Sequence, residues 1–201
     1  MSDEKSMTSG IKVVGLGGSL AQTSSSLAAL RIALEGADKA GAVTELLDVR
    51  ALNLPMYDPR EKDPPDSVRQ LCEAVANSHG LIWSSPLYHG TISGAFKNAL
   101  DWLQLLSARN PPYLTDKVIG LVGAAGGGHG LQAINTMEFV VRALRGWTVP
   151  MVVPISRSWA AFDKNGAAAD PKLAQQLHSL GEEVTRIAQR ISIEPLTTQE
   201  V

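Results

Sequence analysis

The segment IKVVGLGGSLAQTSSS, at residues 11–26, joins a short apolar run to a stretch rich in glycine and hydroxyl groups. The run Ile11–Leu16 predicts a buried strand, because continuous apolar and β-branched residues are typical of strands covered on both faces. The next segment, Ser24–Ala40, has apolar residues at helical spacing and predicts a helix that ends at Gly41. A buried strand that leads through glycines into a helix is a typical unit of parallel α/β folds.

The alternation of strand and helix recurs along the rest of the chain. Apolar runs predict four more strands, at Val43–Val49, Gly80–Ser84, Lys117–Gly123 and Trp147–Ile155. Helical spacing predicts four more helices. One begins at Asp66 or Ser67 and ends at Asn77, and the other three cover Ser93–Ser107, Gly130–Arg145 and Pro171–Ile191. Five strands that alternate with five helices predict an α/β sandwich, whose parallel sheet is covered by helices on both faces.

Length and composition favour one domain and exclude several classes of function. The 201 residues suit a single domain at 11–192, between disordered tails at 1–10 and 193–201. A net charge of −2 argues against nucleic-acid binding, which usually needs a basic patch. The single cysteine, Cys72, excludes a disulfide framework and cysteine-held metal clusters. With no apolar run of ~20 residues and no recognisable leader, we expect a soluble, cytoplasmic protein without a membrane partner.

The segment after the first strand, Gly17–Ser26, has the composition of a phosphate-binding loop. Its glycines allow a tight turn, and its hydroxyls precede a helix amino end, which attracts anions. No lysine follows the glycines, so the P-loop pattern of nucleoside triphosphate binders is absent. We expect the phosphate of a ligand to contact Ser19, Ser24, Ser25 and Ser26.

Three other interpretations of this segment stay open. A Rossmann domain would use Asp48 as the ribose partner, although Leu20 stands where the last glycine of its motif belongs. Gly17-x-Ser19-x-Ala21 also resembles the nucleophile elbow of a serine hydrolase, which needs an acid and a histidine further along the chain. The third interpretation is a polar turn that caps the helix and binds no ligand.

Two segments after the third and fourth strands are suited to a flat heteroaromatic ring. The first combines a proline, main-chain amides and an aromatic side chain that can lie beside such a ring. The second is a run of glycines, which lets the main chain approach a planar ligand edge-on. Together with the segment Gly17–Ser26, these two segments predict one ligand site, because open parallel sheets bind ligands at the carboxyl ends of their strands. The candidate contacts are Pro86, Leu87, Tyr88, His89, Gly90, Gly126, Gly127 and Gly128.

Other chemistry-bearing residues receive structural interpretations. The histidines outside these loops lie apart from other ligand-type residues, so we expect no metal site. Lys97 and Asp101 have the i, i+4 spacing of an ordinary helical ion pair. Ala51–Pro65 contains four prolines and predicts a loop, in which Met56 and Tyr57 are candidates for a contact over a neighbouring site or subunit.

These same residues resemble the NADPH-dependent FMN reductase family, over about Ile11 to Ile191. The chain departs from the family pattern at Ala21, where arginine is usual and would pair with phosphate, and at Ser26 and Leu87. The motifs that carry the resemblance are Gly18-Ser19-Leu20 with Ser24 and Ser26, Ser85-Pro86-Leu87-Tyr88-His89-Gly90, Ser93-Gly94, Lys97-Asn98-Ala99-Leu100-Asp101-Trp102, Gly126-Gly127-Gly128 and Leu54-Pro55-Met56-Tyr57-Asp58.

The resemblance implies a flavodoxin-like three-layer sandwich with strand order 2-1-3-4-5 and with noncovalently bound FMN. The FMN phosphate would lie on the Ser19–Ser26 loop, and the ring between residues 86–90 and 126–128. Family members commonly assemble as homodimers or homotetramers.

The implied activity is the transfer of hydride from NADPH or NADH to bound FMN and on to a small-molecule electron acceptor, by a ping-pong mechanism. That acceptor would be free flavin, a quinone, an azo compound or a metal oxyanion. We assign no catalytic acid or base, because the cofactor does the chemistry. The alternative is a flavodoxin-like electron carrier without a substrate of its own, although such carriers tend to be strongly acidic.

Overall fold

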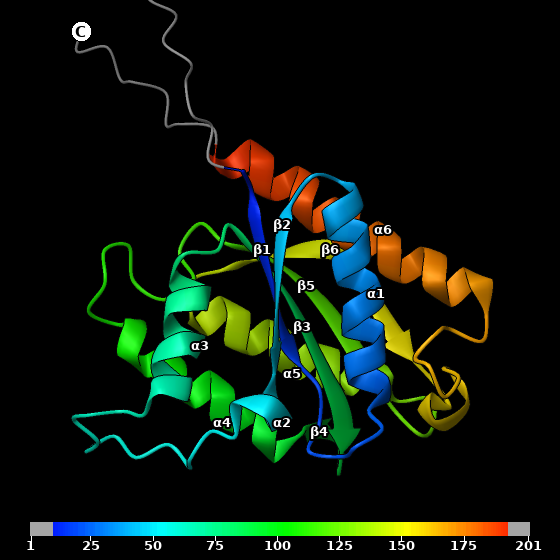
Figure 1. Cartoon of the computed structure of the whole chain (residues 1–201), viewed down its shortest axis with the longest axis horizontal. Coiled ribbons are helices and arrows are strands. Elements are labelled where there is room, and N and C mark those ends of the chain that lie inside the picture. The colour runs from blue at the N-terminus through cyan, green and yellow to red at the C-terminus, as the bar shows by residue number, and fades with distance from the viewer. Residues whose placement is uncertain (1–9, 193–201) are drawn as a thin grey trace, which may run out of the picture.

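The predicted strands form one sheet between two layers of helices in a computed structural model of the chain (Figure 1). The structure describes residues 10–192. The tails predicted at 1–10 and 193–201 therefore lie outside the described residues, except for Gly10. Within residues 10–192, no helix is long and apolar enough to cross a membrane.

Five parallel strands follow the order β2-β1-β3-β5-β6. This is the order 2-1-3-4-5 expected for the five predicted strands, so the flavodoxin-like arrangement is confirmed. A sixth strand of two residues, β4, pairs antiparallel with β3, and the sheet is therefore six-stranded and mixed, where five parallel strands were predicted. The strands are β1 Lys12–Gly17, β2 Val43–Asp48, β3 Gly80–Tyr88, β4 Thr91–Ile92, β5 Val118–Ala124 and β6 Trp147–Ile155.

Helices cover both faces of the sheet (Figure 1). One apolar cluster joins the sheet to α1 and α6, and the other joins it to α3, α4 and α5. The helices are α1 Ser25–Lys39, α2 Val49–Leu52, α3 Asp66–Ala76, α4 Gly94–Trp102, α5 Gly130–Ala143 and α6 Pro171–Ser192, with short 3₁₀ helices η1 Leu103–Leu106 and η2 Ser158–Ala160.

Helices α1 and α6 approach each other closely at two glycines. A Cβ atom on Gly181 would overlap the carbonyl oxygen of Ala33, and one on Gly36 would overlap that of His178. The hydroxyl of Thr185, which donates to the carbonyl oxygen of Gly181 within α6 at 3.0 Å, also lies 3.5 Å from the Ala37 carbonyl oxygen on α1. The close approach of the two backbones leaves no room for a larger side chain at Gly36 or Gly181.

Several element boundaries differ from those predicted. The helix predicted at Ser93–Ser107 ends at Trp102 and continues as the 3₁₀ helix η1, and two further differences lie beside the candidate segments. The strand predicted at Val43–Val49 ends one residue earlier, because the Asp48 carboxylate accepts a hydrogen bond from the Arg50 N–H at 3.0 Å and caps the unpredicted helix α2. The strand predicted to end at Ser84 continues to Tyr88, since β5 lies beside it as far as Pro86. The segment 86–90 is therefore the end of a strand and a turn, where a loop was predicted.

Strand register brings the candidate segments to one edge of the sheet. Gly17 lies opposite Ser84 on β3, and Pro86 lies opposite Ala124 on β5. Ala124 in turn lies opposite Ile155, the last residue of β6. Because these strands are parallel, the segments that follow β1, β3, β5 and β6 meet at the same carboxyl edge, which is where open α/β sheets bind ligands.

Candidate functional site

The loop between β1 and α1 presents donors at the amino end of a helix. Ser24 caps α1, because its Oγ accepts a hydrogen bond from the Leu27 N–H at 3.2 Å. The backbone N–H groups of Ser25 and Ser26 have no hydrogen-bond partner among residues 10–192. These two donors and the positive end of the helix dipole favour an anion at this position.

Hydroxyl groups hold this loop in place as well as lining it. The Ser25 hydroxyl donates to the carbonyl oxygen of Ser158 at 2.7 Å, which ties the loop to η2. The Ser84 hydroxyl donates to the carbonyl oxygen of Ser26 at 2.8 Å, which ties it to β3. Ser24 Oγ and Ser26 Oγ lie 3.0 Å apart and share a hydrogen bond. The predicted contact Ser25 therefore already serves a structural role.

A cavity of about 150 Å³ lies where this loop meets the ends of β3 and β5. Eight of the twelve predicted contacts line it, namely Ser19, Ser24, Ser25, Ser26, Pro86, Leu87, Tyr88 and Gly126. Four predicted contacts, His89, Gly90, Gly127 and Gly128, lie outside that lining. Four residues were not among the predicted contacts, namely Ala21, Thr23, Ala124 and Ser158.

Ser158 was not predicted because ligand loops were expected only after the first, third and fourth predicted strands. It lies three residues beyond the end of β6, at the same edge of the sheet. The available signal was the polar segment that follows the fifth predicted strand.

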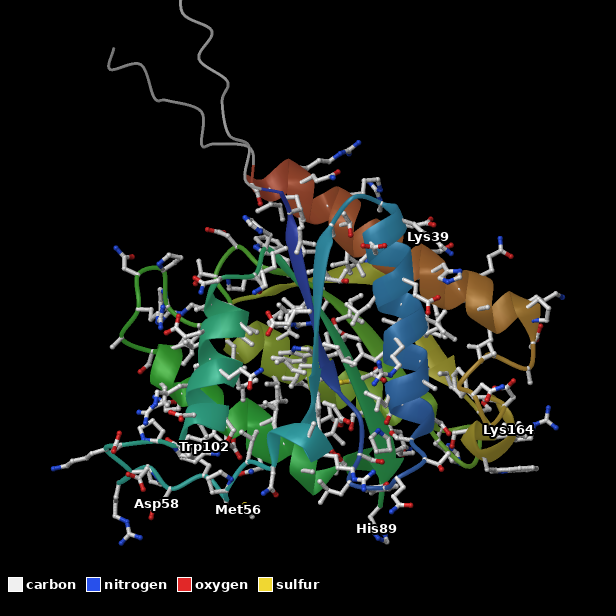
Figure 2. All side chains as sticks on the ribbon, in the orientation of Figure 1. Lys39, Met56, Asp58, His89, Trp102 and Lys164 are labelled. Carbon is white, nitrogen blue, oxygen red and sulfur yellow. The ribbon has the colours of Figure 1, made fainter. Side chains whose placement is uncertain are left out.

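The segment 86–90 forms one side of a two-residue hairpin between β3 and β4. His89 and Gly90 occupy its central positions with φ of 51° and 87°, and type I′ turns require positive φ at both positions. Tyr88 is 49% exposed and stands beside the cavity. Figure 2 shows His89 at the tip of this hairpin. The position of His89 is therefore explained by turn geometry.

The glycine run after β5 is an open main-chain surface. Added Cβ atoms on Gly126 and Gly128 would meet nothing within 4 Å, and one on Gly127 would meet only His129 Cδ2, at 3.9 Å. The N–H groups of these three glycines have no backbone partner among the described residues. Packing among the described residues does not require glycine at these positions, and the absence of side chains leaves room for a ligand to approach the main chain.

The motif on α4 supports the proline-rich loop beside the site. Asn98 accepts a hydrogen bond from the Tyr57 N–H at 2.8 Å and donates to the Pro55 carbonyl oxygen at 2.9 Å. Trp102 Nε1 donates to that same oxygen at 2.9 Å, and its ring packs edge-on against Tyr57. Met56 remains 81% exposed (Figure 2).

The predicted i, i+4 ion pair on α4 is confirmed. Lys97 Nζ lies 2.5 Å from Asp101 Oδ1. Both side chains are about half exposed, so this pair makes only a small contribution to stability.

The strongest titration shifts lie away from this edge. Burial raises the pKa of the Cys72 thiol to about 11, as expected for a packed cysteine. Burial, and to a lesser extent the charge of Lys117, lowers the pKa of His79, whose Nδ1 accepts a hydrogen bond from the Lys12 N–H at 3.0 Å. Among the described residues, no group of three His, Cys, Asp or Glu could hold a metal ion.

Two of the alternatives gain no support from these contacts. Asp48 caps α2 through Oδ1, so this carboxylate has a structural role that requires no ribose. Ser19 Oγ accepts a hydrogen bond from the Ala21 N–H, and no serine within residues 10–192 is hydrogen-bonded to a histidine. The geometry of a serine nucleophile with its base is therefore absent from the described part of the chain.

The order β2-β1-β3-β5-β6 of the parallel strands, with helices on both faces, is that of the flavodoxin-like class of folds. Residues 11–160 match the family model described as NADPH-dependent FMN reductase. The chain belongs to this family.

Three similar proteins illustrate the likeness. The chain is 30% identical to an NAD(P)H-dependent FMN reductase of Pseudomonas aeruginosa over 183 aligned residues, and the alignment covers 87% of this chain and 95% of that protein. It is 34% identical to the NADPH-dependent FMN reductase ArsH of Acidithiobacillus ferrooxidans over 113 aligned residues, and the alignment covers 56% of this chain and 47% of that protein. The apo form of the NADH:FMN oxidoreductase EmoB has a similar fold, with a TM-score of 0.71, 19% identity and 92% coverage of both chains. The chain spans about half the length of the first curated relatives that it matches.

Proposed function

We propose that this chain is an NAD(P)H-dependent flavin reductase that holds FMN noncovalently at the carboxyl edge of its sheet. The observation that carries the proposal is the cavity of about 150 Å³ at which the loops after β1, β3, β5 and β6 converge. Family membership supports the same cofactor and the same class of reaction.

The residues at this edge fit the two ends of FMN. In the proposal, the phosphate accepts hydrogen bonds from the unpartnered N–H groups of Ser25 and Ser26 and from the hydroxyls of Ser19 and Ser24. Gly17–Ser26 contains no lysine or arginine, so dipoles and hydrogen bonds do the work that an arginine does elsewhere in the family.

The ring edge would lie between the hairpin 86–90 and the glycines 126–128. The unpartnered N–H groups of the glycine run are donors in a region with few side chains, and such donors stabilise negative charge on a neighbouring ring. Tyr88 supplies an exposed aromatic wall. His89 and Gly90 would contribute by holding the turn that fixes Tyr88 in place.

When bound, FMN would supply two-electron chemistry between NAD(P)H and a small-molecule acceptor. The main chain of 126–128 would orient the ring for that transfer, and the space beside these glycines leaves room for a second planar group. If both reactants use one exposed ring face in turn, the kinetics are ping-pong, and this is the kinetic scheme that we propose. Free flavin, quinones, azo compounds and metal oxyanions are the acceptor classes to be tested.

An absorbance spectrum of the purified chain, followed by anaerobic titration with NADPH and NADH, tests this proposal. We expect a flavin spectrum that bleaches on addition of reduced nucleotide and returns with an acceptor. Steady NAD(P)H oxidation by the chain alone supports an enzyme, whereas bleaching only in the presence of a separate reductase supports the alternative of an electron carrier. A colourless chain that binds no added FMN contradicts both.

We also propose a homodimer or homotetramer. Large apolar side chains remain exposed on α5, where Phe139 is 71% and Leu131 is 49% exposed. Covering them against another copy would remove apolar surface from water. Sedimentation equilibrium distinguishes a monomer from these assemblies, and a monomer at micromolar concentration contradicts this part of the proposal.

A further inference from the structure

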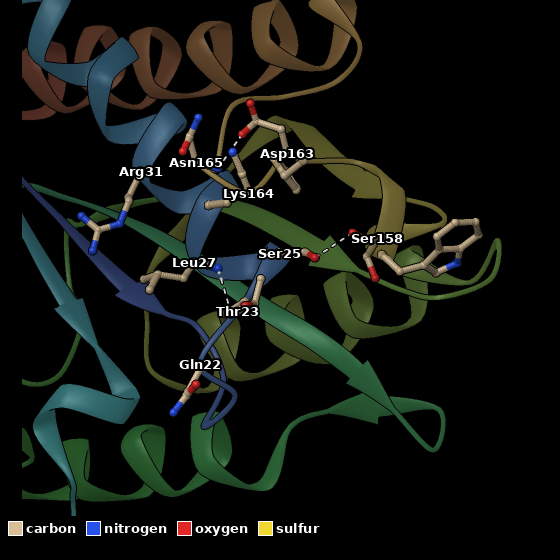
Figure 3. A pocket seen from close by; sticks show the side chains of 14 residues that line it. Gln22, Thr23, Ser25, Leu27, Arg31, Ser158, Asp163, Lys164 and Asn165 are labelled. Atoms are coloured by element: carbon tan, nitrogen blue, oxygen red, sulfur yellow. Dashed lines mark hydrogen bonds between the residues drawn. The ribbon is translucent and has the colours of Figure 1, made fainter.

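A second cavity, of about 580 Å³, adjoins the loop between β1 and α1 on the side of η2 (Figure 3). Figure 3 shows Arg31 and Trp159 at opposite sides of it, so no small ligand there would contact both. Four residues line this cavity as well as the first one, namely Thr23, Ser24, Ser25 and Ser158. The second cavity is therefore an extension of the edge already described.

A third cavity, of about 210 Å³, lies at the opposite edge of the sheet. Its lining comes from the end of α3, from η1 and the loop after it, and from Lys117, which directly precedes β5. The first residues of β3 and β5, Gly80 and Val118, lie opposite each other in the sheet. The cavity is thus at the amino edge, at the end of the strands opposite to β4 in Figure 1.

Lys117 supplies this cavity with a half-buried cation. Its Nζ donates to the carbonyl oxygen of Ala76 at 2.8 Å and to that of Ser78 at 2.6 Å. An ammonium group has three N–H donors, so among the hydrogen bonds within residues 10–192 one donor remains for a ligand.

The charge of Lys117 has no counterion in the described part of the chain. Lys117 forms no ion pair with any residue in the range 10–192. Burial lowers the pKa of its ammonium group to about 8, and the charge of the neighbouring Asp116 offsets this only in part. An anion in the cavity would supply the missing counterion, which lowers the cost of burying the charge.

Arg109 brings a second cation to the same cavity. Its Nη2 pairs with a carboxylate oxygen of Glu73, which leaves other N–H groups of the guanidinium for a ligand. Glu73 and Ala76 lie three residues apart on α3, so both cations are held at the last turn of the same helix. The Arg145 guanidinium lies 6.0 Å from the centre of the Tyr113 ring, which also lines the cavity. Positive charge therefore exceeds negative charge around this cavity.

The size of the cavity and its apolar walls limit what it can hold. Leu106, Pro111 and Tyr113 line it beside the two cations. Pockets for cofactors and drug-sized ligands usually measure about 300–1,000 Å³, so a volume of about 210 Å³ favours a smaller ligand than a nucleotide. A charged head with a short apolar body suits both the cations and these walls.

We propose that the third cavity binds a small organic carboxylate, with its carboxylate on Lys117 and Arg109 and its apolar body against Tyr113. The site lies at the edge of the sheet opposite to the proposed flavin site, so this inference does not rest on the proposed function. Inorganic phosphate has the negative charge without the apolar body, and it is one of the probes in the test.

An NMR titration of the ¹⁵N-labelled full chain, with FMN added, tests the proposal with benzoate as the probe. We expect saturable shifts of the amide signals of residues 76–78 and 106–118. Benzamide has the same ring without the charge and should bind at least about tenfold more weakly, because charge-assisted hydrogen bonds are the stronger ones. Phosphate should also bind more weakly than benzoate, since it leaves the apolar walls uncovered.

Two variants remove the cations one at a time. Lys117→Met keeps most of the length of the side chain and removes its charge, so we expect benzoate affinity to fall by about tenfold or more. Benzamide affinity should change by about twofold or less. Arg109→Ala changes an exposed position and should lower benzoate affinity by about threefold or more. Circular dichroism checks folding, and Arg109→Ala with the map of shifted signals decides the question if Lys117→Met does not fold.

Lys12→Met is the matched control. Lys12 begins β1 at the same edge of the sheet, but its Nζ pairs with the Glu45 carboxylate at 2.7 Å, and it is absent from the lining of the third cavity. Benzoate affinity should be unchanged in this variant. The comparison separates the loss of a cation in the cavity from a general loss of positive charge.

Four outcomes overturn the inference. The first is an absence of saturable benzoate binding to the wild-type chain, and the second is equal affinity for benzoate and benzamide. The third is phosphate binding as tight as that of benzoate, which would make this a site for inorganic anions. The fourth is a set of shifts at residues 126–128 in place of 106–118, which would assign benzoate to the flavin edge. Failure of the chain to retain FMN contradicts the proposed function alone, since the titration can be read without bound flavin.

Discussion

Glycines serve opposite purposes in two regions of this molecule. Between α1 and α6, Gly36 and Gly181 are surrounded by backbone, and a methyl group at either would overlap a carbonyl oxygen. In the run Gly126–Gly128 at the carboxyl edge of the sheet, an added methyl group would meet little or nothing. The protein's own packing requires the first pair, whereas it does not require the second run, which is the run proposed to approach the flavin ring. Both regions contain glycine, so the sequence alone does not distinguish a glycine that packing requires from one that it does not.

The largest effect should come from Gly127→Val. The added side chain fits the fold, because only His129 Cδ2 lies within 4 Å of the new Cβ, but it occupies the space in which the flavin ring would approach. Overpacking a tight contact costs about 1–3 kcal/mol, so we expect FMN affinity to fall by up to about 100-fold. Flavin absorbance after gel filtration measures this, with thermal unfolding as the control for folding. Full retention of flavin would remove the glycine run from the proposed site.

Gly181→Ala should reverse the pattern, with lost stability and retained flavin. The new methyl group overlaps the Ala33 carbonyl oxygen and forces α6 away from α1. We expect the free energy of unfolding in urea to fall by about 2 kcal/mol. Gly126→Ala is the matched control, because its methyl group enters open space and should change stability by less than about 0.5 kcal/mol. Equal losses in both variants would break the contrast between the two regions.

Replacing Ser19 and Ser24 together with alanine should weaken FMN more than riboflavin. The two hydroxyls lie on the loop proposed to hold the phosphate, which riboflavin lacks. We expect FMN affinity to fall by about tenfold, while riboflavin changes by about twofold or less. Because Ser24 also caps α1, unfolding is measured in parallel, with an expected loss of about 1 kcal/mol. Equal losses of both flavins would mean that the phosphate lies elsewhere.

The smallest effect should follow Lys97→Ala. Lys97 and Asp101 form an exposed i, i+4 pair on α4, close to the site but outside the first and second cavities. We expect a stability loss of about 0.3–0.5 kcal/mol that shrinks in high salt, with no change in flavin affinity. A marked loss of FMN would show that the α4 motif contributes directly to binding.

Long elements with regular periodicity were predicted well, and short ones were not. All five long strands and the five long helices appear close to the predicted positions. Helix α2 and strand β4 were missed, because four and two residues are too few to show a period. The extension of β3 through Pro86 was also missed, since a proline argues against a strand unless a neighbouring strand supports it, as β5 does.

The residues of the candidate site stay a prediction, but the sequence brought most of those that line the cavity into view. The three loops were recognised because their residues suit phosphate and ring binding, and register at the carboxyl edge brings eight of the predicted contacts together. The pairing of Ser25 with Ser158 was not foreseeable, since it joins residues 133 positions apart. The second cavity likewise joins α1 to the loop after η2, two segments that no local pattern connects.

The sequence by itself determined the order of strands and helices, the class of fold and the kind of loop at each strand end, because hydrophobic period and glycine or hydroxyl content act over neighbouring residues. Only the tertiary structure decided which glycines are packed and which are open, and which hydroxyls are already hydrogen-bonded. It alone placed Lys117 and Arg109 in the lining of one cavity. Those properties depend on contacts between residues far apart in the chain, and the distances between such residues are set by the packed sheet and its two layers of helices.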